Sequence, residues 1–103
     1  RETRMKLVIT AGAYESYHAS MAFLSELMSE EQLDRLDDQL WDTIDLLPNR
    51  PRMGPFEDML QHPDHRYRKA IIRNFKVIYW IDGQTIVVTD IFYARQDPKR
   101  MKA

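Results

Sequence analysis

The chain has 103 residues, of which 44% are hydrophobic and 30% are charged, the balance of a folded globular domain rather than a disordered segment. This length supports one hydrophobic core, so we expect a single domain. The absence of cysteine excludes disulfides and thiolate metal sites, and no apolar run approaches the roughly 20 residues of a membrane helix. The formal net charge of −1, taken alone, argues against a nucleic-acid partner.

The first residues, Arg1 to Arg4, are not followed by the apolar segment of a secretory signal. Met5 directly precedes a strand-like segment and is the expected natural start. Residues 1–4 are therefore interpreted as an added extension, and residues 5–103 as the domain. With no signal and no cysteine, we expect a cytoplasmic protein.

Two helices are predicted after a first strand at residues 6–10, which are rich in β-branched side chains. Residues 13–28 change to a helical spacing of three and four, with the apolar positions Tyr14, Tyr17, Met21, Leu24 and Met28. Ser29 and Gln32 form a capping box that starts a second helix, which ends at Pro48. Its apolar stripe is Leu33, Leu36, Leu40, Ile44 and Leu47. The short break between the helices predicts an antiparallel helical hairpin.

Residues 48–65 contain four prolines and Gly54 and are predicted to form a long loop, which in a small domain is usually functional. Three strands follow, at residues 67–72, 75–81 and 85–93, where the period changes to two. Arg73-Asn74 is expected to make the first turn, and Asp82-Gly83 is a type I′ signal for the second. The predicted fold is α+β in two layers, β-α-α-β-β-β, with the helical hairpin packed on a mainly antiparallel sheet.

The charges are unevenly distributed along the chain. Residues 5–47 carry two basic and nine acidic side chains, a net charge of −7, whereas residues 48–103 carry eleven basic and six acidic side chains, a net charge of +5. The near-zero total is therefore a cancellation between an acidic helical hairpin and a basic sheet. Because the basic charge is concentrated in one half of the chain, a polyanionic partner is no longer excluded. Long-range attraction of the whole molecule to nucleic acid should still be weak, and this favours a protein target.

A basic cluster occupies residues 66–76, which contain no acidic side chain and include interleaved aromatic residues. The candidate residues for contacting a partner molecule are Arg66, Arg68, Lys69, Arg73, Lys76, Arg95, Lys99 and Arg100. Clustered basic and aromatic residues are typical of a surface that faces phosphate groups or nucleic acid. The alternative is that these charges only solvate the exposed face of the sheet.

The sequence contains no phosphate-binding glycine loop, no zinc-protease helix motif and no nucleophile elbow. His62 and His65 flank Asp64, but so few ligands predict a metal site only weakly, and no metal or cofactor is expected. Metal-free RNA cleavage needs a base, an acid and cations for the phosphate charge. No histidine or glutamate lies between residues 66 and 95, so Lys69, Lys76 or His62 would have to act as the base. The sheet does offer Tyr93 as an acid and, as cations, Arg66, Arg68, Arg73 and Arg95.

Several segments, taken in order, resemble the RelE/ParE superfamily of toxins from bacterial type II toxin–antitoxin systems. They are the first strand ending in Thr10-Ala11, the helical hairpin, the segment from Leu46 to Gly54, the Arg66-Tyr67-Arg68-Lys69 strand, the segment from Phe75 to Ile81, and the ending from Asp90 to Pro98. The resemblance covers nearly all of residues 5–100. It implies a growth-inhibiting toxin of the kind that stabilises plasmids, held in a hetero-oligomer with a cognate antitoxin.

The resemblance implies two mechanisms. RelE-like members cleave mRNA on the ribosome with basic residues and a C-terminal Tyr or His, whereas ParE-like members act on DNA gyrase and largely lack that catalytic set. Tyr93-Ala94 stands where a histidine commonly precedes the basic tail, and the long second helix and the Arg-Gln-Asp-Pro ending are more ParE-like. The ParE-like function is therefore favoured, with a metal-independent mRNA interferase and an inactive antitoxin-binding module as the alternatives.

Overall fold

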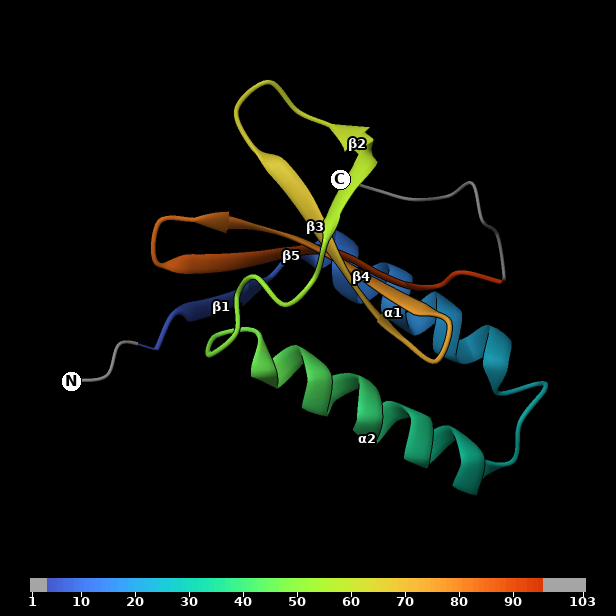
Figure 1. Cartoon of the computed structure of the whole chain (residues 1–103). Helices are drawn as coiled ribbons and strands as arrows, with labels where there is room; N and C mark the ends of the chain where they lie inside the picture. The colour runs from blue at the N-terminus through green and yellow to red at the C-terminus, as the bar shows by residue number, and fades with distance from the viewer. Residues whose placement is uncertain (1–3, 96–103) are drawn as a thin grey trace.

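The computed structural model describes residues 4–95, which form two helices and five strands. In chain order these are β1 (Lys6–Ile9), α1 (Ala11–Leu24), α2 (Glu30–Leu46), β2 (Phe56–Gln61), β3 (Arg66–Ile72), β4 (Phe75–Asp82) and β5 (Thr85–Tyr93). The strands make one sheet in the order β1-β5-β4-β3-β2, in which β1 runs parallel to β5 and the other neighbours are antiparallel. The predicted α+β fold with a helical hairpin on a mainly antiparallel sheet is confirmed (Figure 1). No helix in the described range is long and apolar enough to span a membrane.

Strand β2 corrects the prediction of a structureless loop over residues 48–65. The observed element order gains one strand and is β-α-α-β-β-β-β. The β2 sequence, Phe-Glu-Asp-Met-Leu-Gln, has no β-branched residue and two acidic ones, so strand propensity does not indicate it. Pairing with β3 stabilises it instead, although an irregularity between Phe56 and Gln61 interrupts the register.

Helix α1 differs from the prediction in its bounds and in its buried face. Thr10, which the sequence places in the first strand, is the N-cap of α1 and accepts a hydrogen bond from the Ala13 amide at 3.1 Å. Of the predicted apolar stripe, Leu24 is buried but Tyr14 is 43% exposed. The side chains that α1 buries are Ala13, Ser16, Ser20 and Leu24. These mostly small residues let the helix backbone pack closely on β5, which apolar spacing alone does not reveal.

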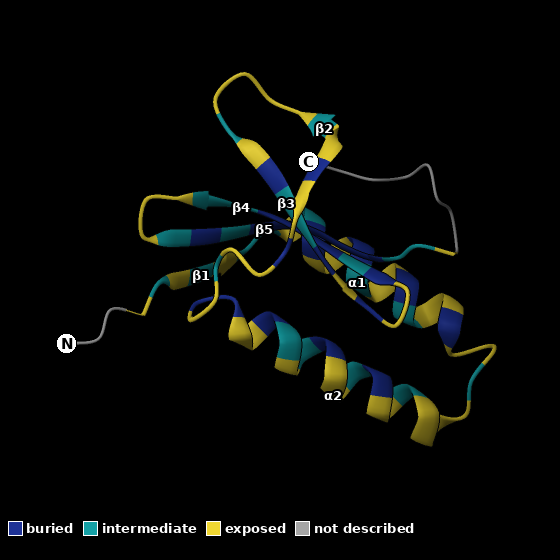
Figure 2. Cartoon of the chain, viewed as in Figure 1, coloured by how far each residue is buried: buried dark blue, intermediate teal, exposed yellow. Residues whose placement is uncertain are grey.

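Helix α2 follows the prediction closely. Ser29 is its N-cap, and both hydrogen bonds of the capping box with Gln32 are present, at 2.9 and 3.1 Å. Leu33 packs against the core at the edge of the stripe. The fully buried members of the stripe are Leu36, Leu40, Ile44 and Leu47. Figure 2 shows this helix buried along one side and exposed along the other, as its spacing predicts.

The two predicted β-turns are both present, but one has a different geometry. Arg73 and Asn74 both have positive φ angles, +48° and +73°, as a type I′ turn requires. In the second turn, Asp82 pairs with Thr85, so Gly83 is the first central residue. Gly83 has a φ of +60°, whereas the φ of Gln84, the second central residue, is not positive. A type I′ turn needs positive φ at both positions, so this turn is type II′ rather than the predicted type I′.

The sheet has two unlike faces. One face carries Val77, Tyr79 and Val88 in a core shared with both helices. The opposite face, which we call the open face because no helical residue within residues 4–95 joins its cluster, carries Tyr67, Ile78 and Phe92, which are themselves buried at 4%, 0% and 1% exposure. Strand alternation decides which side chains reach the open face, so the basic residues of β3 and β4 are divided between the two faces.

Candidate functional site

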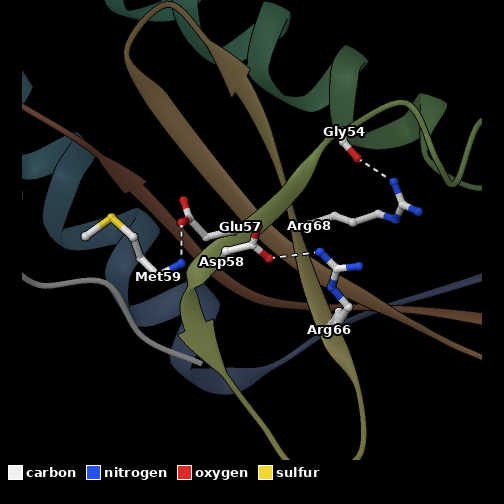
Figure 3. A network of polar contacts seen from close by, with 6 residues as sticks. All are labelled: Gly54, Glu57, Asp58, Met59, Arg66 and Arg68. Atoms are coloured by element: carbon white, nitrogen blue, oxygen red, sulfur yellow. Dashed lines mark hydrogen bonds and ion pairs between the residues drawn. The ribbon is translucent and has the colours of Figure 1, made fainter.

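The β2–β3 hairpin and the segment before it hold a network of polar contacts at the predicted basic cluster (Figure 3). Arg66 and Arg68 alternate with Tyr67 and therefore project from the same side of β3. Their guanidinium carbons lie 3.5 and 4.0 Å from the centroid of the Phe56 ring, within cation–π range. Arg66 also forms an exposed ion pair with Asp58 at 2.9 Å. The two predicted arginines thus lie together, on an aromatic residue of the strand that the sequence does not predict.

Arg68 donates to the backbone of the segment between α2 and β2 (residues 47–55), which we call the connector. Its Nη1 donates to the Gly54 carbonyl at 2.8 Å and to the Arg52 carbonyl at 3.5 Å. The Tyr79 hydroxyl also holds the connector, because it donates to the Pro51 carbonyl at 2.8 Å and accepts from the Gly54 amide at 3.1 Å. Burial raises the pKa of the Tyr79 hydroxyl, so it stays a donor at neutral pH.

Gly54 is required by close contact rather than by its φ angle. A Cβ atom at this position would lie 2.3 Å from the backbone oxygen of Lys69 and 2.9 Å from the Tyr79 hydroxyl. Both distances are shorter than van der Waals contact allows, and the nearer atom is backbone. The connector can therefore lie flat against β3 only with glycine at this position.

Lys69 and Lys76 lie on the open face and share one acidic partner. Glu57 Oε1 is 3.3 Å from Lys69 Nζ and 3.5 Å from Lys76 Nζ. The Glu57 side chain is only 2% exposed, whereas the two lysine side chains are 27% and 24% exposed. The other carboxylate oxygen of Glu57 accepts a hydrogen bond from the Met59 amide at 3.0 Å. The two predicted cations therefore come together on a buried carboxylate that the sequence does not predict.

Glu57 is ionised at neutral pH. Burial would raise the pKa of Glu57, but the Met59 amide and then the Lys69 and Lys76 ammonium groups outweigh it and hold that pKa below its ordinary value. Because its conjugate acid is strong, this carboxylate is a weak general base at neutral pH. Glu57 thus neutralises the lysines rather than acting as a general base.

Tyr93 lies away from the arginine pair, in a small group of aromatic side chains. It is half-buried, and its ring centroid is 5.7 Å from that of Phe75 and 6.2 Å from that of Phe23. Its amide donates to Ser20 Oγ at 2.9 Å. Two phenylalanine rings thus flank the ring of Tyr93.

Among the other basic candidates, the structure describes Arg73 and Arg95, and neither contacts Phe56 or Glu57. Arg73, in the β3–β4 turn, donates to the Gln39 side chain of α2 at 3.1 Å. Arg95 is exposed. Lys99 and Arg100 lie outside the described residues, as do the Gln-Asp-Pro part of the ParE-like ending and most of the predicted added extension.

The residues suggested for RNA cleavage fall into two groups. Arg73 lies in the β3–β4 turn next to Phe75, the pairing partner of Tyr93, whereas Arg66 and Arg68 lie farther along the sheet. Tyr93 pairs with Phe75, while Arg68 pairs with Tyr79 farther along the same strand β4. At roughly 3.3 Å per residue, the step from Phe75 to Tyr79 separates these positions by about 13 Å. Within residues 4–95, the geometry does not bring the suggested acid to the arginine pair.

The His62-Pro63-Asp64-His65 segment forms an aromatic stack at the end of the hairpin. The His65 ring lies between the rings of His62 and Trp80, with centroid distances of 3.9 and 3.8 Å, and the Tyr67 ring meets it edge-on at 4.8 Å. Burial lowers the pKa of His65, and the neighbouring His62 lowers it further. Within the described residues, no three histidine, aspartate or glutamate side chains gather in a way that could hold a metal ion.

Sequence patterns miss Glu57, Phe56 and Tyr79 for different reasons. Glu57 and Phe56 lie in the unpredicted strand, where acidic residues and nearby prolines indicate a loop. Tyr79 is predicted to lie in a strand, and it is fully buried, but no pattern shows that its hydroxyl holds the connector. Gly54, which stands next to a proline in a proline-rich segment, is the one available signal of close backbone packing.

Comparison with known proteins identifies the family. The sequence model of the family described as "ParE toxin of type II toxin-antitoxin system, parDE" matches residues 17–98, which is most of the chain. A search of curated proteins finds no significant match. The fold is similar to that of a solved structure described as "Chromosomal ParDE TA system from P. aeruginosa", with a TM-score of 0.69 and 16% identity over 89% of this chain and 98% of that chain. The chain therefore belongs to the ParE toxin family, the toxin components of type II toxin–antitoxin systems.

Proposed function

We propose that this toxin inhibits growth by binding DNA gyrase, without catalysing a reaction, and that a cognate antitoxin neutralises it. Family membership supports a toxin, and the structurally similar protein comes from a chromosomal ParDE toxin–antitoxin system. The observation that carries the choice of mechanism is the separation of the candidate acid, Tyr93, from the arginine pair Arg66 and Arg68. Tyr93 packs against Phe75 and Phe23, about 13 Å along the sheet from the arginine pair.

The charge of the open face supports the same mechanism. An mRNA interferase must bind a phosphate backbone and stabilise charge that develops during cleavage. Lys69 and Lys76 are instead shared by the ionised Glu57. By contrast, Arg66, Phe56 and Arg68 present planar cations and an aromatic ring, residue types that are enriched in protein–protein contacts.

A supercoiling assay with purified gyrase, relaxed plasmid and ATP tests the proposal. We expect the toxin to inhibit supercoiling at micromolar concentration, and the product of a neighbouring antitoxin reading frame to restore it. Arg66→Gln should weaken inhibition by about tenfold, the effect of roughly 1.4 kcal/mol at an interface. Arg35→Gln removes an exposed cation from α2 and is the matched control.

The same preparation should be added to translating ribosomes. Site-specific mRNA cleavage together with unaffected supercoiling would contradict the proposal and restore the RelE-like alternative. Growth that is unimpaired when the toxin is expressed alone would instead favour the inactive antitoxin-binding module.

A further inference from the structure

We propose that Glu57 is a specificity residue: it occupies the two lysines of the open face and thereby prevents that face from binding single-stranded nucleic acid. The inference goes beyond the gyrase proposal, because it concerns a ligand that the wild-type protein rejects. It is measured with RNA and without gyrase, so either proposal can fail while the other stands.

The open face offers a polyanion two neighbouring, partly exposed cations. Lys69 lies two residues from Tyr67 on β3, and Lys76 lies two residues from Ile78 on β4, so both lysines share the face of the Tyr67–Ile78–Phe92 cluster. The cluster itself is buried, with Tyr67, Ile78 and Phe92 only 4%, 0% and 1% exposed, and the Trp80 ring is stacked on His65, so the lysines rather than aromatic rings would meet a ligand on this face. A positively charged surface binds the backbone of a single-stranded nucleic acid without sequence preference.

Glu57 reaches this face from the edge strand β2. Its Oε1 atom contacts both ammonium groups, at 3.3 and 3.5 Å, and its Oε2 atom is fixed by the Met59 amide at 3.0 Å. In Figure 3 its side chain points to the opposite side of the hairpin from Arg66 and Arg68. The carboxylate thus occupies the position that a phosphate oxygen would take between two lysines.

The ion pairs alone do not explain why a glutamate is buried here. Taking a carboxylate out of water is costly, and buried ion pairs often add no net stability relative to apolar packing. Both lysine side chains remain about a quarter exposed, at 27% and 24%, so each could reach water without Glu57. What Glu57 changes most is the charge that the face presents to a polyanion.

Removing the carboxylate should therefore create RNA affinity. In Glu57→Gln, two lysines become available to phosphates, and each phosphate contact on a single strand contributes about −0.7 to the slope of log K against log salt. The slope should steepen by about 1.4, and affinity at about 50 mM salt should rise on the order of tenfold. The readout is the fluorescence anisotropy of a short labelled single-stranded RNA.

Two controls separate this effect from a change in total charge. Glu15→Gln removes the same charge from the exposed surface of α1 and should leave RNA binding at the wild-type level. The triple variant Glu57→Gln, Lys69→Gln, Lys76→Gln should lose the gained affinity and the added salt dependence. A gain in Glu57→Gln that persists in the triple variant would overturn the proposal.

A second substitution keeps the test decisive if Glu57→Gln fails to fold. Glu57→Asp retains the net charge, but its side chain is one methylene shorter and cannot bridge the two ammonium groups in the same way. We expect intermediate RNA affinity at unchanged net charge, with a cooperative thermal transition to verify folding. If the folded variants bind RNA no more tightly than Glu15→Gln, Glu57 does not have this role.

Discussion

At the scale of single residues, Tyr79 shows how one hydroxyl can position a functional loop. Its ring is fully buried in the core, and its hydroxyl lies against the backbone of the connector through Pro51 and Gly54. A carbonyl of the connector, that of Gly54, accepts a hydrogen bond from Arg68, and the guanidinium group of Arg68 lies over the Phe56 ring. A buried tyrosine therefore fixes the orientation of an arginine through the backbone that both of them contact.

Tyr79→Phe should destabilise the protein by about 1–3 kcal/mol, because it leaves the Gly54 amide and the Pro51 carbonyl without this partner while keeping the ring. Urea unfolding measures the change. Tyr14→Phe, which alters a tyrosine that is 43% exposed, is the matched control and should have little effect. Equal stability of the two variants would show that the hydroxyl does not hold the connector.

Glu57 should make the free energy of unfolding depend on pH in the acidic range. Its folded-state pKa lies below the ordinary value of 4.5, so its contribution is present above the unfolded pKa and is lost as pH falls through the folded one. Between about pH 6 and about pH 3, wild type should lose more stability than Glu57→Gln, which has no carboxyl group to protonate. Parallel curves of unfolding free energy against pH would contradict this assignment.

At the scale of elements, the capping box that the sequence predicts at the start of α2 is present in the folded structure. Ser29→Ala should cost about 1 kcal/mol, because the Gln32 amide loses its side-chain acceptor. Thermal or urea unfolding measures the loss. Ser25→Ala, which removes a hydroxyl that donates to the Ala22 carbonyl at the end of α1, should cost less. The reverse order would mean that the box does not determine where α2 begins.

Elements are predictable from sequence where one local pattern dominates. The α2 stripe and the Arg73-Asn74 turn follow from spacing and from backbone preference, and both are observed. Helix α1 is harder to predict, because its buried face is made largely of alanine and serine, which hydrophobicity does not mark. Strand β2 escapes prediction because its pairing with β3, rather than its own composition, makes it a strand.

The candidate site is less predictable than the fold. The sequence supplies the cations, but strand alternation and the position of β2 decide which of them share a surface. Lys69 and Lys76 meet on Glu57, whereas Arg66 and Arg68 meet on Phe56. Glu57 and Phe56 both lie on β2, the strand that local sequence patterns do not indicate. Which cations share a surface can therefore be seen only in the three-dimensional structure.

At the scale of the whole molecule, the acidic and basic halves differ in how their charge is compensated. The basic sheet carries counter-charges of its own, Glu57 and Asp58, on β2. The helical hairpin keeps a net charge of −7 over residues 5–47, with acidic residues exposed along α2, among them Asp34, Asp38, Asp42 and Asp45. Long-range electrostatics should therefore orient the molecule with its hairpin away from polyanions.

The parallel pairing of β1 with β5 has a consequence for how the chain folds. The first strand joins the last, with Lys6 opposite Thr85 and Ile9 opposite Val88, whereas β3, β4 and β5 are joined by short turns. Contacts between distant segments form late, because closing a long loop costs more entropy than closing a hairpin. A ribosome must therefore synthesise β5 before β1 can find its partner, and the newly made toxin cannot complete its sheet until the segment up to Tyr93 is available.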